Sequence, residues 1–119
     1  MIQQLTKEAI AKAFSKGNFE MTYPYLSDDI EWNVIGDEIV RGRENVINKC
    51  KQTRRYFDSI TTQFLVSNVI QLDNHVFITG TGVFINKKER TQIDACDLYF
   101  FDDAGKLETI ASYCVPIAP

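Results

Sequence analysis

A lone carboxylate in a run of apolar and aromatic residues is the position in this chain best suited to chemistry. Residues 91–115 read TQIDACDLYFFDDAGKLETIASYCV, which predicts two strands joined by a tight turn at 102–105, where Asp and Gly tolerate the backbone that a turn needs. Alternation along the first strand places Asp97 on a face whose other members are apolar or aromatic: Ile93, Ala95, Tyr99 and Phe101. If that face is buried, the carboxylate must be paired, hydrogen-bonded or neutral. Such a group is the expected acid or base of a proton-transfer site.

Several neighbours of Asp97 are predicted to face the same side of this hairpin. Alternation on the second strand places a hydroxyl, a thiol and an aliphatic side chain there, from Ser112, Cys114 and Ile110. Tyr99 could donate a hydrogen bond to a ligand, or it could satisfy its hydroxyl locally, as buried tyrosines usually do. Cys114 has no histidine or helix N-terminus near it in the sequence, so a nucleophilic role is not expected. Together these residues form a candidate ligand-binding wall around Asp97.

Two further stretches could complete such a site. Gly80 and Gly82 share one face of the predicted strand ITGTGVF. Two missing side chains on one face leave room for a ligand or for the close approach of a helix, or they mark only a bent strand. Trp32 could be a stacking platform for a ligand, or it could serve as core or cavity wall.

Helical spacing is found mainly in the first half of the chain. Apolar residues three and four apart predict a helix up to about Lys16. A short second helix is predicted at 19–26 and a third at 44–57, with a turn at 27–29 and a short strand at 30–35 between them. The remainder alternates like strand, over 60–72, 75–85 and the hairpin.

This order of elements predicts an α+β fold, with helices segregated from an antiparallel sheet. We expect a curved mixed, mostly antiparallel sheet wrapped around the N-terminal helices, forming a cone with an apolar cavity. No repeat, low-complexity tract or linker divides the chain, so residues 1–119 are expected to form a single domain.

Composition narrows the classes of function. A net charge of −3 argues against nucleic acid as a partner, because such binding needs a surplus of Lys and Arg. Three cysteines without C-x-x-C spacing and a single histidine predict reduced thiols and no metal site, and no cofactor motif is present. No apolar run is long enough for a membrane span or a signal peptide, so no membrane association and a cytoplasmic location are expected.

Three strings, together with the order of the elements, resemble the nuclear transport factor two-like superfamily in its SnoaL-like and ketosteroid-isomerase-like branch. They are FSKGNFEMTYPYLSDDIEW before the first strand, IGDEIVRGRENV before the third helix, and CDLYFFDDAGKLETI in the hairpin. The resemblance covers nearly the whole chain and implies the cone-shaped fold. It implies little about activity, since this scaffold hosts isomerases, cyclases, dehydratases, hydrolases and non-enzymatic binders.

The resemblance also implies roles for individual residues. Asp97 lies in register with the acid of the steroid isomerases, but Asn33 stands where their general base lies and Ile10 where their tyrosine lies. Because an amide cannot act as that base, standard steroid isomerisation is not expected, and Asn33 is predicted to bind ligand instead. The epoxide-hydrolase branch needs an Asp-Arg-Asp cluster, whereas this chain offers Ser112 at one aspartate position and no arginine within 76–84.

We therefore predict a protein that binds a small apolar or aromatic molecule, with Asp97 and Asn33 as its polar contacts. If it is an enzyme, Asp97 would transfer protons as in an isomerase or cyclase, without a metal. The alternative is a non-catalytic module whose cavity carries a ligand or is filled by its own side chains. The resemblance also implies a homodimer through the outer face of the sheet, where the apolar members are Cys96, Leu98 and Phe100 beside Asp94.

Overall fold

The computed structural model describes residues 4–117 and contains one open sheet of six strands, in the order β2-β1-β6-β5-β4-β3. The elements are α1 (Lys7–Ser15), the 3₁₀ helix η1 (Glu20–Tyr25), β1 (Leu26–Val34), β2 (Glu38–Arg41), α2 (Arg43–Ser59), β3 (Thr61–Leu72), β4 (His75–Asn86), β5 (Glu89–Phe101) and β6 (Leu107–Ile117). All neighbouring strands are antiparallel except β1 and β6, which are parallel. The predicted α+β fold with a mixed, mostly antiparallel sheet is confirmed. Within the described residues, no helix has both the length and the apolar character required to cross a membrane.

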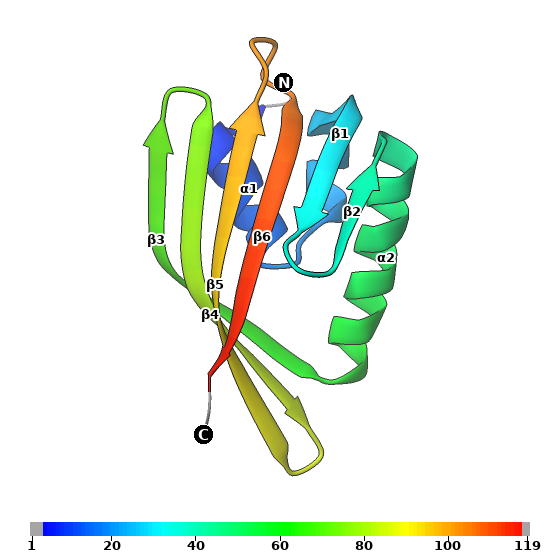
Figure 1. Ribbon diagram of the computed structural model, residues 1–119, viewed down its shortest axis with the longest axis vertical. Coiled ribbons are helices and arrows are strands. Elements are labelled where there is room, and N and C mark those ends of the chain that lie inside the picture. The colour runs from blue at the N-terminus through cyan, green and yellow to red at the C-terminus, as the bar shows by residue number, and fades with distance from the viewer. Residues whose placement is uncertain (1–3, 118–119) are drawn as a thin grey trace.

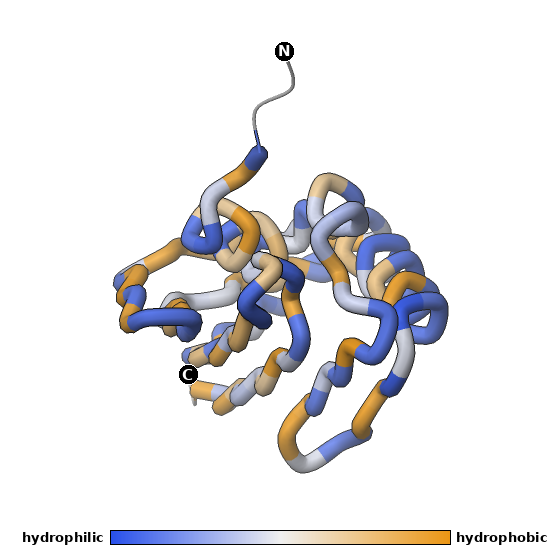
Figure 2. The backbone as a smooth tube through the Cα atoms, turned by 90° about the horizontal axis from the view of Figure 1, so that it is seen from above, coloured by the Kyte–Doolittle hydropathy of each residue, from blue (hydrophilic) through white to orange (hydrophobic). Residues whose placement is uncertain are grey.

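The helices lie on one side of the curved sheet (Figure 1). Helix α1 packs against β3, β4 and β5, whereas α2 packs against β1, β2 and β3. Seen from above, the strands curve around the helices, and hydrophobic and hydrophilic residues alternate along them (Figure 2). The sheet therefore has an inner face toward the helices and an outer face that nothing in the described part of the chain covers.

The end of α1 is fixed by its capping, and this end carries side chains of the candidate site. Thr6 starts the helix by accepting a hydrogen bond from the backbone N–H of Ala9 at 3.1 Å. At the other end Gly17 adopts φ 83°, which a glycine tolerates, and the N–H of Asn18 bonds to the carbonyl of Ala13 at 2.9 Å. These bonds define the two ends of α1, and Ser15 lies in its last turn.

The first strand is longer than its sequence indicates. A turn was expected at 27–29, but these residues belong to β1, so that prediction is wrong. The cause is an irregularity within the strand. The β1–β6 register shifts between Leu26 and Glu31, and the N–H of Asp29 bonds to the hydroxyl of Ser27 at 3.1 Å. A residue order typical of a turn thus produces a local bulge inside a strand.

The hairpin of β5 and β6 forms with the turn that its sequence predicts. One carboxylate oxygen of Asp102 accepts from the N–H groups of Ala104 and Lys106, both at 2.9 Å, and Gly105 has φ 85°. The resulting register places Asp97 opposite Ser112. This pairing joins the two strands that carry most of the candidate site.

Candidate functional site

A cavity of about 250 Å³ lies between the helices and the inner face of the sheet, and we call it the Asp97 cavity. Most of its surface is apolar. Its polar or ionisable lining residues are Ser15, Lys49, Thr53, Asp97, Ser112 and Cys114; its other lining residues are Phe14, Phe19, Trp32, Val34, Phe57, Phe64, Phe84, Ile93 and Ala95. The composition is that of a small-ligand site, in which a few polar groups set orientation within an apolar pocket.

Asp97 is the acidic residue of this cavity and is only 8% exposed. Its Oδ2 accepts a hydrogen bond from the hydroxyl of Ser15 at 2.7 Å, and the hydroxyl of Tyr99 lies 3.5 Å from the same oxygen. Ser15 comes from α1 and Tyr99 from the same strand as Asp97, so tertiary packing rather than local sequence assembles the group. The carboxylate is therefore held in one orientation by the fold.

Two buried aromatic residues support the hydroxyls around Asp97. The hydroxyl of Tyr99 lies 2.6 Å from that of Ser15, and the indole Nε1 of Trp32 donates to the hydroxyl of Ser112 at 3.0 Å. The ring of Trp32 in turn packs edge-on against Phe14, with centroids 4.9 Å apart. Asp97 thus has the hydroxyls of Ser15 and Ser112 as neighbours. Ser15 contacts the hydroxyl of Tyr99, and Ser112 accepts from the indole of Trp32.

Burial changes the protonation of this group. Desolvation raises the pKa of Asp97, although the hydroxyls of Ser15, Ser112 and Tyr99 act in the opposite direction by stabilising the carboxylate. Desolvation and the negative charge of Asp97 raise the pKa of Tyr99 well above its ordinary value, so its phenol stays protonated. The site holds a carboxyl group that takes up a proton more readily than an exposed one does.

Four of the predicted ligand contacts meet around this cavity or directly beneath it. Trp32, Ser112 and Cys114 line it with Asp97, and Tyr99 lies beneath them with its hydroxyl in the network. Ile110 pairs with Tyr99 in the hairpin and is buried in the core, but it does not line the cavity. Alternation along β5 and β6 was sufficient to find Tyr99, Ser112 and Cys114, whereas Trp32 comes from β1.

Asn33 is not among the residues that line the cavity, so its predicted position is wrong. It pairs with Ile39 and Ala111, and it borders a surface hollow with Glu31 and Leu98 on the outer face of the sheet. The reason is the strict alternation of a strand. Because Trp32 points inward, its neighbour Asn33 must point outward.

Gly80 and Gly82 do not provide the space that was expected. A side chain at Gly80 would place its Cβ 2.6 Å from both the carbonyl oxygen of Leu65 and the ring of Phe64. At Gly82 the Cβ would lie 3.0 Å from Ile93. The missing side chains therefore admit neighbouring residues of the protein, and it is Phe64 and Ile93 that reach the cavity.

Gly80→Ala is consequently expected to lower the free energy of unfolding by about 1–3 kcal/mol, because a backbone carbonyl cannot move aside as a flexible side chain can. Gly82→Ala is the matched control, with an expected loss of less than about 1.5 kcal/mol, since its contact is the end of an isoleucine side chain. Urea denaturation of both variants measures the difference. Equal losses in the two would contradict this account, because they would show that the backbone contact at Gly80 is no harder to relieve than the side-chain contact at Gly82.

Cys114 stands at the solvent side of the cavity and its thiol is not activated. The residue is exposed over much of its surface. Loss of water on its cavity side, followed by the negative charge of Asp97, raises its pKa. A protonated thiol is a poor nucleophile.

Three polar lining residues were missed: Ser15, Lys49 and Thr53. Ser15 contacts Asp97 across 82 positions of sequence, and such a contact depends on how α1 docks on the sheet. The available signal was its place one residue after Phe14, at the end of the apolar stripe of α1. Among residues 4–117, no group of three or more His, Cys, Asp and Glu side chains is arranged to hold a metal ion.

A second hollow of about 360 Å³ adjoins the cavity, and we call it the outer hollow. Phe57, Phe84 and Ile93 line both spaces, while Tyr56, Ile60, Asn86, Glu89 and Thr91 line only the outer one. The rings of Phe57 and Phe84 are 5.9 Å apart and form part of the partition. An apolar wall with polar residues beyond it separates the Asp97 cavity from this hollow.

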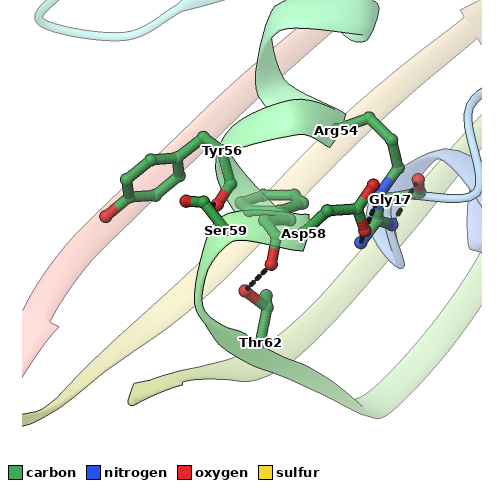
Figure 3. A network of polar contacts seen from close by, with 7 residues as sticks. Gly17, Arg54, Tyr56, Asp58, Ser59 and Thr62 are labelled. Atoms are coloured by element: carbon green, nitrogen blue, oxygen red, sulfur yellow. Dashed lines mark hydrogen bonds and ion pairs between the residues drawn. The ribbon is translucent and has the colours of Figure 1, made fainter. Parts of the chain in front are cut away.

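The end of α2 that carries Phe57 is anchored by polar contacts (Figure 3). Arg54 donates to the carbonyl of Gly17 at 3.0 Å and pairs with Asp58 at 2.9 Å, while Thr62 bonds to the carbonyl of Phe57 at 3.0 Å. The guanidinium of Arg54 also lies 5.5 Å from the centre of the Phe57 ring. These contacts tie α2 to the end of α1 and to the start of β3, so the partition has a fixed position.

The known proteins that resemble this chain were found among solved structures. No family model matches the sequence, and no curated protein is similar to it. An NTF2-like protein of unknown function from Cytophaga hutchinsonii is 33% identical, with a TM-score of 0.82; the match covers 89% of this chain and 93% of that one. This identity and coverage show common family membership as well as a common fold.

Two more distant structures share the fold alone. A protein named as a SnoaL-like polyketide cyclase from a Jannaschia species is 10% identical with a TM-score of 0.72, covering 95% of this chain and 91% of that one. An LEH-like epoxide hydrolase from M. tuberculosis is 21% identical with a TM-score of 0.67, covering 92% and 84%. Proteins named for different activities thus have this architecture, so the fold alone does not identify the reaction.

Proposed function

The chain belongs to the NTF2-like superfamily, and from this premise we propose that the Asp97 cavity binds a small, largely apolar molecule. The observation that supports this most is a carboxyl group only 8% exposed in the apolar lining of a cavity. Burying a carboxyl group costs free energy, and an apolar residue in a purely structural role would avoid that cost. Ser15 and Ser112 hold it in position, and Trp32 in turn holds Ser112, as expected of a binding group.

The enzymatic form of this proposal is proton transfer by Asp97, as in an isomerase or cyclase. Because burial raises its pKa, Asp97 is suited both to release and to take up a proton in the apolar cavity. Neither Asn33, which lies on the outer face, nor Ile10, which is buried in the core, can supply a second catalytic group. The chemistry would therefore rely on Asp97 and the bound molecule, without the base and tyrosine of the steroid isomerases.

The second candidate is a non-catalytic binding or structural module. It is favoured by the small volume of about 250 Å³, which is below the usual range for ligand pockets of roughly 300–1,000 Å³. In that case Asp97 would orient a carried ligand, or the surrounding side chains would close on the cavity. Turnover of a bound compound by the wild type and its loss in Asp97→Asn would reject this candidate.

Trp32 is the only tryptophan of the chain and lines the cavity, so its fluorescence reports on binding there. We expect 4-propylphenol to quench or shift this fluorescence with saturation. Ala95→Leu, which places a larger side chain in the cavity, is expected to abolish the response while the protein remains folded by circular dichroism. A saturable response that survives in this variant would place the binding elsewhere and reject the proposal.

Phe57→Ala is expected to change which ligand length binds best. Removal of the ring joins the Asp97 cavity to the outer hollow, so 4-hexylphenol should gain about ten-fold in affinity relative to 4-propylphenol. The control is Tyr56→Ala, because Tyr56 is 59% exposed and lines only the outer hollow. Fluorescence titration measures the ratio of affinities, and an unchanged ratio in Phe57→Ala would show that the ring is not the partition.

We also propose a homodimer formed through the outer face of the sheet. Large apolar residues are exposed there on β3 and β6, namely Leu65, Ile70, Leu72, Tyr113, Val115 and Ile117. An apolar surface of this extent is typical of an interface. Light scattering at micromolar concentration is expected to give twice the chain mass of 13.6 kDa, and Val115→Lys to give the monomer. A monomeric wild type would contradict the proposal.

A further inference from the structure

The direction of the hydrogen bonds around Asp97 follows from the number of hydrogens available. The hydroxyl of Ser15 has one hydrogen and donates it to Oδ2 of Asp97 at 2.7 Å. Ser15 also lies 2.6 Å from the hydroxyl of Tyr99, so Tyr99 must supply the hydrogen of that second bond. The bonds therefore run in one direction, from Tyr99 to Ser15 to Asp97.

The hydrogen bonds through Ser112 also run toward the carboxylate of Asp97. An indole N–H can only donate, so Trp32 makes Ser112 an acceptor at 3.0 Å. The single hydrogen of Ser112 remains free to point at Asp97, which faces it across the β5–β6 ladder. Ser112 indeed stabilises the ionised form of Asp97. Two chains of donors thus converge on one carboxylate.

The hydroxyl of Thr53 is engaged elsewhere, since it donates its hydrogen to the carbonyl of Lys49 at 2.8 Å. The ammonium group of Lys49 pairs with Glu38 at 3.4 Å, which engages one of its three hydrogens. The thiol of Cys114 is a weak donor. A carboxylate has about four lone-pair sites, and only Ser15 and Ser112 have a hydrogen to give Asp97, because that of Tyr99 goes to Ser15, so about two acceptor sites remain on a residue that lines the cavity.

We infer that the molecule bound in the Asp97 cavity carries a hydrogen-bond donor, such as a hydroxyl or N–H group, and that the site selects it over an analogue that can only accept. This inference rests on the proposed function and specifies the chemistry of its ligand. A donor completes the coordination of Asp97. An ether or ketone at the same position would face the carboxylate and leave it unpaired, because the hydroxyl hydrogens of Ser15, Thr53 and Ser112 are already committed.

The test compares 4-propylphenol with its methyl ether, 4-propylanisole, by titration of Trp32 fluorescence at pH 8. We expect the phenol to bind about ten-fold more tightly, the effect of one hydrogen bond to a charged group. Equal or tighter binding of the ether would overturn the inference while leaving the proposed cavity function intact. If neither compound binds, both the inference and the proposed function fail for ligands of this size.

Variants separate this selectivity from a general effect on the cavity. Asp97→Asn offers both a donor and an acceptor, so the preference for the phenol is expected to fall to about two-fold or less. Asp94→Asn, on the exposed outer side of the same strand, should retain the full preference. Acidification should also reduce the preference in the wild type, because protonated Asp97 can donate to the ether. A preference that is constant from pH 8 to pH 4, or unchanged in Asp97→Asn, would contradict the role of this carboxylate.

Discussion

Trp32→Ala is expected to lower the free energy of unfolding by about 3–5 kcal/mol, the usual cost of truncating a buried tryptophan. Trp32 is only 7% exposed and packs against Phe14 at 4.9 Å and Phe19 at 6.2 Å between ring centres. These contacts join β1 to α1 and to the segment that follows it. Urea denaturation followed by circular dichroism measures the loss, because the variant has no tryptophan left for fluorescence.

Trp32→Phe is the matched control for this variant. It keeps an aromatic ring against Phe14 but removes the hydrogen bond to Ser112, so a loss of about 1–2 kcal/mol is expected. The difference between the two variants separates ring packing from hydrogen bonding. If Trp32→Ala lowers the free energy of unfolding by less than about 1 kcal/mol, Trp32 does not stabilise the core, and the packing described above is contradicted.

Asp97→Asn is expected to stabilise the protein at neutral pH, by about 1 kcal/mol. Because burial raises the pKa of Asp97 in the folded protein, the folded state binds more protons than the unfolded state above about pH 4. Wild-type stability is therefore lost as the pH rises from the unfolded pKa through the folded one. The amide of the variant does not titrate, so its advantage should be small near pH 4 and largest at pH 8.

Urea denaturation of the wild type and of Asp97→Asn between pH 4 and pH 8 measures this difference in the free energy of unfolding. Titration of the groups that both proteins share cancels when the two values are subtracted. Asp37→Asn, an exposed substitution in the turn between β1 and β2, is expected to change stability by less than about 0.5 kcal/mol across the range. An advantage of Asp97→Asn that grows toward acid would mean that the carboxylate stabilises the fold. A gain in stability together with a loss of ligand selectivity would identify Asp97 as a residue kept for function.

Most of the fold could be predicted from local patterns. The hairpin of β5 and β6 follows from period-two alternation and from Asp102 and Gly105 in its turn. The extension of β1 could not, because Ser27 and Asp29 are turn formers whose local hydrogen bond is absorbed as a bulge once β6 pairs beside them. Tertiary pairing in that segment outweighed the preference of the residues.

The candidate site was predictable along each strand but not between elements. Alternation identified Asp97 and Ser112 as neighbours, since both lie in one hairpin. The same rule, applied strictly, excludes Asn33 once Trp32 faces inward, whereas the family resemblance placed Asn33 at the site. Ser15 required knowledge of how α1 docks, because its bond to Asp97 joins two elements distant in sequence.

The measurement that tests the central claim most directly is amide chemical-shift mapping by NMR with 4-propylphenol, on the wild type and on Ala95→Leu. Binding in the Asp97 cavity predicts saturable shifts at Ser15, Trp32, Asp97 and Ser112 that disappear in the filled variant. Absence of saturable shifts at these residues, or shifts confined to the outer face around Leu98 and Tyr113, would contradict the assignment of this cavity as the binding site.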